Sequence, residues 1–435
     1  MRICLLAYRG NPHSGGQGVY LVQLARALHH RGHRVEAVVG PPIPPGLEDV
    51  ARVWPVPNLH LWGVYREAWL PRTRPLQLLH PLNLLEFALT RARFFPEPLA
   101  FSLRAMALLT RIGASRRFDV LHDVQTLGPG MWMMKALGLP VLTTVHHPLR
   151  IDRDGALARK PGFWERYHAA AFYPVGMQGW AIRRLHHVVT AAEAGKQSIM
   201  EAFGVPPERI SVVPGGVDTA FFHNPGGMRR RANTLLFVGN SDDWKKGAVY
   251  LARALARLPE RVRLRVVDAG APERAVLPAE VERLGLGGRV DFLGKLPAED
   301  LRAEYCRATL LVQPSLYEGL GLPAAEALAC MTPVVATHAA AVPEVVPPGC
   351  GLLAPPGDPA ALADAITTML GDANLRKTTA EAGHRHVTTR LSWDAAVEGT
   401  EAVYRRLIQQ VGGQNGGAGN PATGASQTSE EGARP

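Results

Sequence analysis

The chain has 435 residues, of which 46% are hydrophobic and 20% are charged, and its formal net charge is +10. One hydrophobic core stops growing at about 250 to 300 residues, so we expect two domains of about 200 residues each. This composition excludes a disordered, fibrous or membrane-spanning class. The positive charge suggests an anionic partner, either a phosphorylated substrate or an acidic membrane face. Nucleic acid ranks lower, because the sequence has no zinc-finger spacing, RNP-like strand or long basic helix.

The start of the chain and its cysteines indicate the compartment. Residues 3–7 form an apolar run that is too short for a secretory leader or a bilayer span of about 20 residues, and they predict a first β-strand. The four cysteines form no Cys-x-x-Cys pair and have no histidine at metal-ligand spacing. We therefore expect a cytoplasmic protein with reduced thiols and without a metal ion or other cofactor. The four are Cys4, Cys306, Cys330 and Cys350.

The first half of the chain alternates short apolar runs with amphipathic helical patterns. A strand over 2–8, a glycine-rich loop over 9–18, a helix over 19–31 and a strand over 34–39 form one unit. The handedness rule for such a unit makes the sheet parallel. Further strands are expected at 120–122, 141–145 and 187–191.

A second series of the same kind begins near residue 234. The sequence thus predicts two doubly wound α/β halves that join near 203–213. Ligands of such sheets bind beyond the carboxyl ends of the strands, so two facing halves create a cleft between domains. The strands of the second half are expected at 235–239, 264–267, 290–293, 309–313 and 333–336.

The end of the chain divides into two parts. Apolar residues at helical spacing predict a final helix over 393–411. Residues 412–435 contain no Val, Ile, Leu or aromatic residue and are rich in Gly, Ser, Thr and Asn. Such a segment cannot bury enough apolar surface to become ordered, so we expect a disordered tail.

The most informative segment covers residues 314–330. It leaves a strand, turns through two glycines and enters a helix with Pro323 near the first helical position. The N–H groups at a helix start attract phosphate. Glu318 lies in the loop and Glu326 one turn inside the helix, and carboxylates accept hydrogen bonds from sugar hydroxyls well. Taken alone, the pattern also fits a solvated Glu318 and a Glu326 that stabilises the helix start.

With its neighbours, this segment resembles the family-4 glycosyltransferases of GT-B fold, whose mark is two glutamates separated by seven residues. Glu318 and Glu326 have that spacing. The resemblance covers nearly the whole chain apart from the tail, and several matches in the right order are more specific than any one of them. The other matches are 14–16 (Ser-Gly-Gly), 143–146 (Thr-Thr-Val-His), 213–218 (Val-Pro-Gly-Gly-Val-Asp), 237–239 (Phe-Val-Gly) with 246–247 (Lys-Gly), 292–294 (Phe-Leu-Gly) and 343–346 (Pro-Glu-Val-Val).

The resemblance implies an α/β architecture of the GT-B kind, in which two facing Rossmann-like domains enclose an interdomain cleft. Residues 1–200 would form the acceptor-binding domain and 201–392 the nucleotide-sugar-binding domain. The helix over 393–411 would pack back on the first domain and couple the two.

The resemblance also implies roles for single residues. In similar proteins the carboxylate matching Glu318 holds hydroxyls of the donor sugar, and the one matching Glu326 holds the ribose. The lysine matching Lys246 neutralises the diphosphate. His146 would contact the donor sugar, although the adjacent His147 leaves this choice open. We therefore take His146, Glu318 and Lys246 as the candidate catalytic residues.

The remaining donor contacts come from loops. Gly15 and Gly16 would let the backbone approach the diphosphate closely, because they have no side chain. Where the family usually has an arginine, this chain has Asn240, and a neutral amide cannot offer bidentate charge to phosphate. Either Lys245 or an arginine elsewhere compensates, or turnover is reduced. The other expected donor contacts are Leu293, Gly294, Leu320, Gly321 and Leu322.

The function implied by the resemblance is the retaining transfer of a hexose-type sugar from a nucleotide diphosphate sugar to a hydroxyl of a glycan, glycolipid or small molecule. Aromatic and basic residues alternate over 59–117. This mixture suits an anionic membrane at its inner face or a lipid-linked acceptor, and equally suits core helices with basic solvent faces. A non-catalytic nucleotide-sugar-binding protein, an epimerase and a phosphorylase stay as alternatives. A dinucleotide-dependent oxidoreductase is disfavoured, because 9–18 lacks the Gly-x-Gly-x-x-Gly fingerprint.

Overall fold

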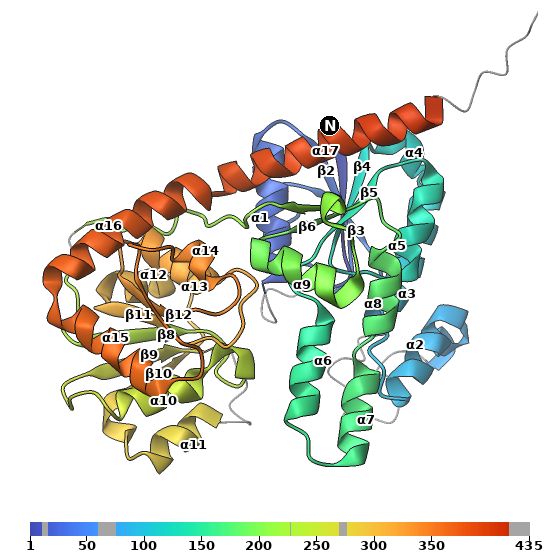
Figure 1. The fold of residues 1–435 in the computed structure, drawn as a ribbon. Coiled ribbons are helices and arrows are strands. Elements are labelled where there is room, and N and C mark those ends of the chain that lie inside the picture. Colours follow the sequence, from blue (N-terminus) through green and yellow to red (C-terminus); the bar gives the residue numbers. More distant parts are fainter. Residues whose placement is uncertain (11–15, 60–74, 227, 269–275, 417–435) are drawn as a thin grey trace, which may run out of the picture.

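A computed structural model describes residues 1–10, 16–59, 75–226, 228–268 and 276–416. It contains two parallel β-sheets, one in each half of the chain, with helices packed on them (Figure 1). This is the doubly wound arrangement that the alternating pattern predicted. The strands are rich in Val, Ile and Leu and are largely buried, as expected for parallel sheets covered on both faces.

The first sheet has seven strands in the order β3-β2-β1-β4-β5-β6-β7. Strands β1 and β2 pair in parallel, from Arg2 opposite Arg34 to Ala7 opposite Val39. The strands are β1 (Arg2–Ala7), β2 (Arg34–Val39), β3 (Arg52–Pro55), β4 (Val120–Val124), β5 (Val141–Thr144), β6 (His187–Thr190) and β7 (Ile210–Val212).

Helices cover the first sheet and extend beyond it. In the first helix, Leu21, Leu24 and Leu28 are fully buried, because their spacing of three and four residues places them on one face. A hairpin of α6 and α7 projects past the end of the sheet (Figure 1). The helices are α1 (Gln17–His30), α2 (Pro81–Arg91), α3 (Glu97–Arg111), α4 (Ala114–Arg117), α5 (Pro129–Met133), α6 (Leu149–Ala158), α7 (Phe163–Phe172), α8 (Val175–Ile182) and α9 (Glu193–Phe203).

The second sheet has six strands in the order β10-β9-β8-β11-β12-β13. Its strands are β8 (Thr234–Val238), β9 (Arg263–Val267), β10 (Val290–Gly294), β11 (Leu310–Gln313), β12 (Val334–Thr337) and β13 (Leu352–Ala354). Its helices are α10 (Ala248–Leu255), α11 (Val276–Arg283), α12 (Ala298–Arg307), α13 (Leu322–Ala329), α14 (Val342–Val345), α15 (Pro359–Gly371) and α16 (Ala373–Arg390).

The boundary between the sheets lies further along the chain than the predicted division after residue 200. That division would cut α9 and would leave out β7, which pairs in parallel with β6. The second sheet starts only with β8. A three-residue strand such as β7 gives too short an apolar run to be assigned to either half from sequence.

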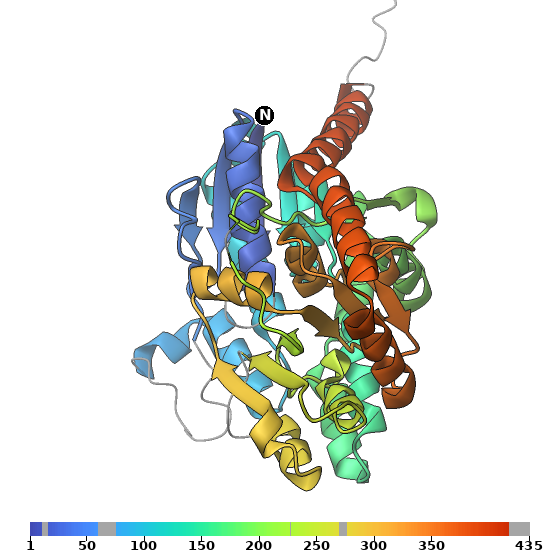
Figure 2. The same cartoon turned by 90° about the vertical axis from the view of Figure 1, so that its left-hand side faces the viewer.

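The last helix, α17 (Trp393–Gly416), leaves the second domain and runs along the first (Figures 1 and 2). Val397, Tyr404 and Leu407 are buried in the first-domain core beside α1. The helix was expected to end at 411, with a structureless tail from 412, but residues 412–416 continue it. Extending a formed helix needs no new nucleation, which offsets the cost of about 1 kcal/mol that each glycine adds. The rest of the expected tail lies outside the described residues.

Candidate active site

The carboxyl ends of the two sheets meet across the domains. Loop 314–321 follows β11, and His146 follows β5. A Cβ placed on Gly319 would lie 2.7 Å from the carbonyl oxygen of His146, so only glycine lets the two loops approach this closely. Gly16, at the start of α1, lies against the side chain of Leu322. The predicted sugar-contacting and carboxylate-bearing segments therefore adjoin each other.

Lys246 and Glu318 form an ion pair within this junction. The Lys246 Nζ lies 2.8 Å from Glu318 Oε1 and 3.0 Å from Oε2, and Ser315 Oγ donates to Oε1 at 2.8 Å. The Glu318 side chain is 7% exposed. Gly247 has φ 65°, and a Cβ there would lie 2.0 Å from the carbonyl oxygen of Pro314. Glycine is therefore required for Lys246 to reach the β11 loop.

Glu326 lies one turn inside α13 and is held by a different partner. The Tyr305 hydroxyl donates to its Oε2 at 2.7 Å. Burial raises the pKa of Glu326 to about 7, although the Tyr305 hydrogen bond opposes the shift. The carboxyl group is thus poised between its neutral and ionised forms at neutral pH.

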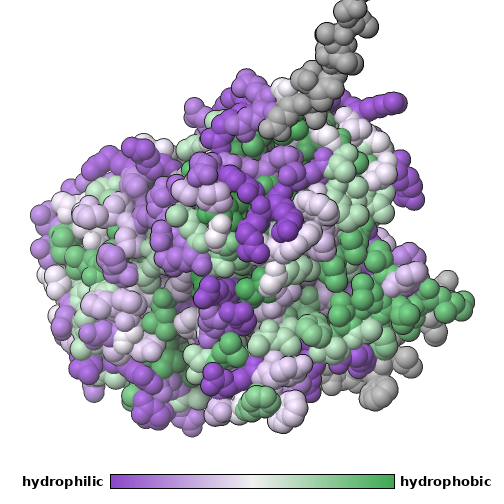
Figure 3. Space-filling view, turned by 45° about the vertical axis from the view of Figure 1, so that its right-hand side comes forward, coloured by the Kyte–Doolittle hydropathy of each residue, from purple (hydrophilic) through white to green (hydrophobic). Residues whose placement is uncertain are grey.

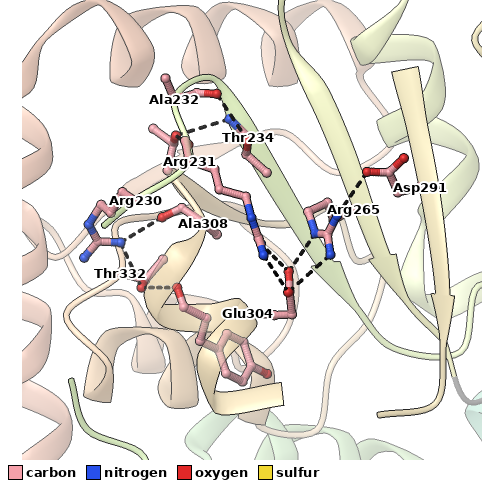
Figure 4. Close-up of polar contacts among 11 residues, drawn as sticks. Arg230, Arg231, Ala232, Thr234, Arg265, Asp291, Glu304, Ala308 and Thr332 are labelled. Carbon is pink, nitrogen blue, oxygen red and sulfur yellow. Dashed lines mark hydrogen bonds and ion pairs between the residues drawn. The ribbon is translucent and has the colours of Figure 1, made fainter. Parts of the chain in front are cut away.

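A cluster of charges fixes the helix that carries Tyr305 (Figure 4). Glu304 in α12 accepts from Arg265 Nε at 2.7 Å and from Arg231 Nη1 at 2.8 Å. Burial alone would raise the pKa of Glu304, but the hydrogen bonds from the two arginines lower it. Arg265 of β9 and Arg231 just before β8 thus tie α12 to the second sheet, and α12 carries the Tyr305 that contacts Glu326.

His146 and His147 have different surroundings. His146 N donates to Gln125 Oε1 at 2.7 Å, and its ring lies edge-on to Tyr20 with 4.8 Å between ring centroids. Burial, together with the neighbouring His147, lowers the pKa of His146 to about 4, so its ring is neutral at neutral pH. Its Nε2 is buried, and no partner for it lies among the described residues. His147 Nε2 instead lies 2.8 Å from Asp152 Oδ2.

Lys245, one of the residues that could compensate for the missing arginine, is paired with carboxylates in this structure. Lys245 binds Asp152 of α6 across the domains and lies 3.4 Å from Asp243 Oδ2. An ammonium group between two carboxylates is already compensated. Asn240 is exposed, and its Oδ1 accepts from Asp242 N in a local turn.

The structure places the other expected donor contacts at two sites, the start of α13 and the end of β10. Gly321 begins α13 with φ 96°, a conformation that favours glycine. Leu320 lies against Gly215 of the segment between the sheets. Leu293 and Gly294 end β10 at the far edge of the sheet, where Gly294 O accepts from Asp268 N. Gly15 lies outside the described residues.

Two further properties bear on the site. In the ranges that the structure describes, no group of three or more His, Cys, Asp and Glu side chains could hold a metal ion. Among the same residues, no helix combines the length and the apolar character that crossing a bilayer requires.

Comparisons with known proteins agree with this architecture. Residues 14–221 match the family described as Glycosyltransferase Family 4, and residues 232–372 match Glycosyl transferases group 1. The chain is 37% identical over 420 residues to the MMP alpha-(1->4)-mannosyltransferase of Mycolicibacterium hassiacum, covering 94% of this chain and 99% of that one. It is 29% identical over 448 residues to the D-inositol 3-phosphate glycosyltransferase of Salinispora arenicola, covering 93% of this chain and 90% of that one.

Among solved structures, sucrose-phosphate synthase from Thermosynechococcus elongatus has a TM-score of 0.68 with 21% identity, covering 94% of this chain and all of that one. The fold is therefore the GT-B fold, and the protein is a glycosyltransferase. It belongs to glycosyltransferase family 4, which confirms the resemblance drawn from the glutamate spacing.

Proposed function

We propose that this glycosyltransferase moves a hexose-type sugar from a nucleotide diphosphate sugar to a hydroxyl acceptor with retention of anomeric configuration. The observation that carries the proposal is the Lys246–Glu318 pair where the carboxyl ends of the two sheets meet. It combines one cation for a diphosphate with one acceptor group for sugar hydroxyls. The name of the relative from Mycolicibacterium hassiacum, a mannosyltransferase, supports a hexose as the transferred group.

In this mechanism the incoming donor separates Lys246 from Glu318 and gives each residue a new partner. The diphosphate takes Lys246, and Glu318 then accepts from hydroxyls of the sugar. The acceptor oxygen bonds to the anomeric carbon while the bond from that carbon to the phosphate oxygen breaks. The acceptor proton passes to the departing phosphate oxygen on the same face, which gives retention. Lys246 contributes by meeting the charge that develops on the leaving group.

His146 and Glu326 complete the proposed donor site. The buried Nε2 of His146 has no partner among the described residues, and a neutral imidazole can exchange a hydrogen bond with a sugar hydroxyl. Glu326 uses Oε2 for Tyr305, and we assign Oε1 to the ribose of the nucleotide. No metal ion enters the proposal.

The first domain, which we assign to the acceptor, has an exposed apolar surface. Within 59–117, α3 is a core helix, as one of the two alternatives expected. Four leucines around α2 are exposed instead: Leu76 and Leu79 are 77% exposed, Leu84 55% and Leu85 38%. Apolar side chains cover the same side of the molecule in Figure 3. Arg91 and Arg93 are exposed beside them. Leucines rimmed by arginines fit an anionic membrane surface or a lipid-linked acceptor.

Sedimentation with vesicles tests the membrane contact. We expect the protein to pellet with phosphatidylglycerol vesicles at low salt and to be released by substituting Leu76 and Leu79 with serine. Substituting the buried Leu109 to Ala disturbs the core instead and serves as a stability control. Equal binding to neutral and anionic vesicles would remove the anionic lipid from the proposal, and no binding to either would remove the membrane.

The transfer itself is tested in two stages. Thermal unfolding against UDP-, GDP-, ADP- and TDP-sugars identifies the donor, because a bound ligand stabilises the folded state by mass action. Product analysis by NMR then gives the anomeric configuration. An α-linked product from an α-linked donor supports retention. An inverted product, free epimer or phosphorolysis product would overturn the proposed reaction, and donor binding without turnover would support the non-catalytic alternative.

A further inference from the structure

A chain of polar side chains crosses the interior of the first domain. The Tyr404 hydroxyl of α17 lies 2.5 Å from Nδ1 of His122 in β4. His122 Nε2 lies 2.7 Å from Thr144 Oγ1 in β5, and that oxygen lies 3.2 Å from the Tyr20 hydroxyl in α1. Tyr404 and His122 are fully buried, and Thr144 is nearly so. Four separate elements therefore contribute to one connected network.

The neutral state of His122 makes all hydrogen bonds of this network run the same way, and the tautomer of the ring sets which way that is. Burial, together with the nearby His146, lowers the pKa of His122 to about 3, so the ring is neutral at neutral pH. A neutral imidazole has one donor and one acceptor nitrogen. When Tyr404 donates to Nδ1, Nε2 must donate to Thr144, and the threonine hydroxyl is then left to donate to Tyr20. Removing one hydroxyl leaves a buried polar atom without its partner and disturbs the next link.

The network ends at the proposed site. The Tyr20 ring lies edge-on to His146, with 4.8 Å between centroids and 81° between ring planes. The same tyrosine ring meets Trp393 at the start of α17, at 5.6 Å. Tyr20 is therefore held by its hydroxyl on one side and by α17 on another, and its ring bounds the space that the His146 ring occupies.

We propose that Tyr404, His122, Thr144 and Tyr20 are positioning residues for His146, so that the C-terminal helix helps to build the active site of the first domain. The inference rests on the proposed role of His146 in transfer. An apolar set of side chains would fill the same volume without desolvating four polar groups. The polar set instead fixes one orientation of Tyr20, and through it one orientation of His146.

A double-mutant cycle distinguishes positioning from general stability. Tyr404→Phe keeps the ring and removes the hydroxyl, and Tyr20→Phe cuts the network at its other end. We expect each to lower kcat about 5-fold or more, the scale of coupling between residues in one network. In a His146→Ala background the same substitutions should have almost no further effect. Equal fold-losses in both backgrounds, or no loss in the wild-type background, would overturn the inference.

Arg406→Met is the matched control on the same helix. Its guanidinium lies 3.1 Å from Ser211 Oγ and 2.9 Å from His187 Nε2, so it anchors α17 without touching the network. We expect its kcat to stay within about 2-fold of wild type. A loss as large as that of Tyr404→Phe would show that any weakening of α17 suffices and would also overturn the inference.

A readout without substrate separates this inference from the proposed function. In protein with ¹³C-labelled histidine, the His146 ring resonance can be assigned by its absence in His146→Ala. Tyr404→Phe and Tyr20→Phe should shift that resonance, whereas Arg406→Met should not. An unmoved resonance in both phenylalanine variants contradicts the positioning role even if no donor has been found. A shifted resonance with no transfer activity would count against the proposed function alone.

Discussion

At the level of single residues, the pairing of Lys246 with Glu318 matters most. Without a donor, each group has the other as its partner, which keeps both charges compensated in a poorly hydrated place. The ion pair also holds the Lys246 ammonium near the loop that leads into α13. A diphosphate entering there meets a cation that is already positioned, which is the preorganisation that electrostatic catalysis requires.

Lys246→Met should therefore lower kcat/KM by about 100-fold to 1,000-fold, the range for loss of one preorganised group that stabilises developing charge. Initial rates over a range of donor concentrations measure this. Lys377→Met, an exposed lysine on α16, is the matched control and should leave the rates unchanged. If both variants turned over like wild type, the assignment of the phosphate cation would be wrong.

Glu326 should make stability depend on pH in a predictable direction. Its pKa is raised from 4.5 to about 7 in the folded state, so its contribution is complete below about pH 4.5 and is lost as pH rises through about 7. The free energy of unfolding of wild type, relative to Glu326→Gln, should fall by up to about 1.4 kcal/mol for each pH unit in that window. Urea unfolding of both proteins measures the difference. A constant difference would contradict the raised pKa.

The sequence predicted one part of this site better than the other. Glu318, Lys246 and His146 belong to local motifs at the ends of strands, so their placement follows once the strands are assigned. Tyr305 carries no such signal, because its partner Glu326 is 21 residues away on another helix. Asp152 was missed for the same reason: it meets Lys245, 93 positions later, only after the two domains pack.

At the level of elements, one buried carboxylate adds an ionic contact to the apolar packing that holds α17 on the first domain. Glu401 lies 2.7 Å from both Arg31 Nε and His33 Nε2, and its side chain is 2% exposed. Burial alone would raise its pKa, but the hydrogen bonds from Arg31 and His33 lower it to about 2. Its contribution to stability is therefore complete above about pH 4.5 and is lost as pH falls towards 2.

Glu401→Gln should lower the free energy of unfolding at neutral pH by about 2 kcal/mol, because the buried carboxylate accepts hydrogen bonds from Arg31 and His33 that a neutral amide makes more weakly. Urea denaturation measures this. Arg405→Met removes the most exposed partner of the same carboxylate, on the same helix, and should change stability by less than about 1 kcal/mol. Similar losses in the two variants would mean that the carboxylate acts as a surface group.

Elements with strong periodicity were predictable, and their ends were not. The start of α17 and the strands of the first unit follow from apolar spacing. The end of α17 at 416 and the three-residue strand β7 do not, because neither contains enough apolar residues to give a period. β7 forms by pairing with β6, whereas the last turn of α17 continues the helix that precedes it.

At the level of the whole molecule, polar contacts join the domains on both sides of the site. Lys245 binds Asp152, and burial of that carboxyl is outweighed by His147 and Lys245, which lower its pKa to about 2. On another side, Glu344 accepts from the backbone N–H groups of Glu193 and Ala194 at the start of α9, at 2.9 and 3.0 Å. These contacts hold the carboxyl ends of the two sheets next to each other, as the proposed function requires.

Asp152→Asn should weaken this closure and admit water to the donor. We expect the ratio of donor hydrolysis to sugar transfer to rise by about 10-fold, as for loss of one partly buried charged contact. Asp154→Asn is the matched control on the same helix, because Asp154 is half exposed and pairs with Arg150 and Arg153 of α6. An unchanged ratio in Asp152→Asn would show that the Lys245 contact does not govern water entry.

A crystal structure with the donor's nucleoside diphosphate tests the central claim most directly. We predict that Lys246 Nζ leaves Glu318 and binds a phosphate oxygen, that Glu326 binds the ribose, and that Glu318 is left facing the position of the sugar. A diphosphate bound elsewhere, with the Lys246–Glu318 pair still intact, would contradict the account.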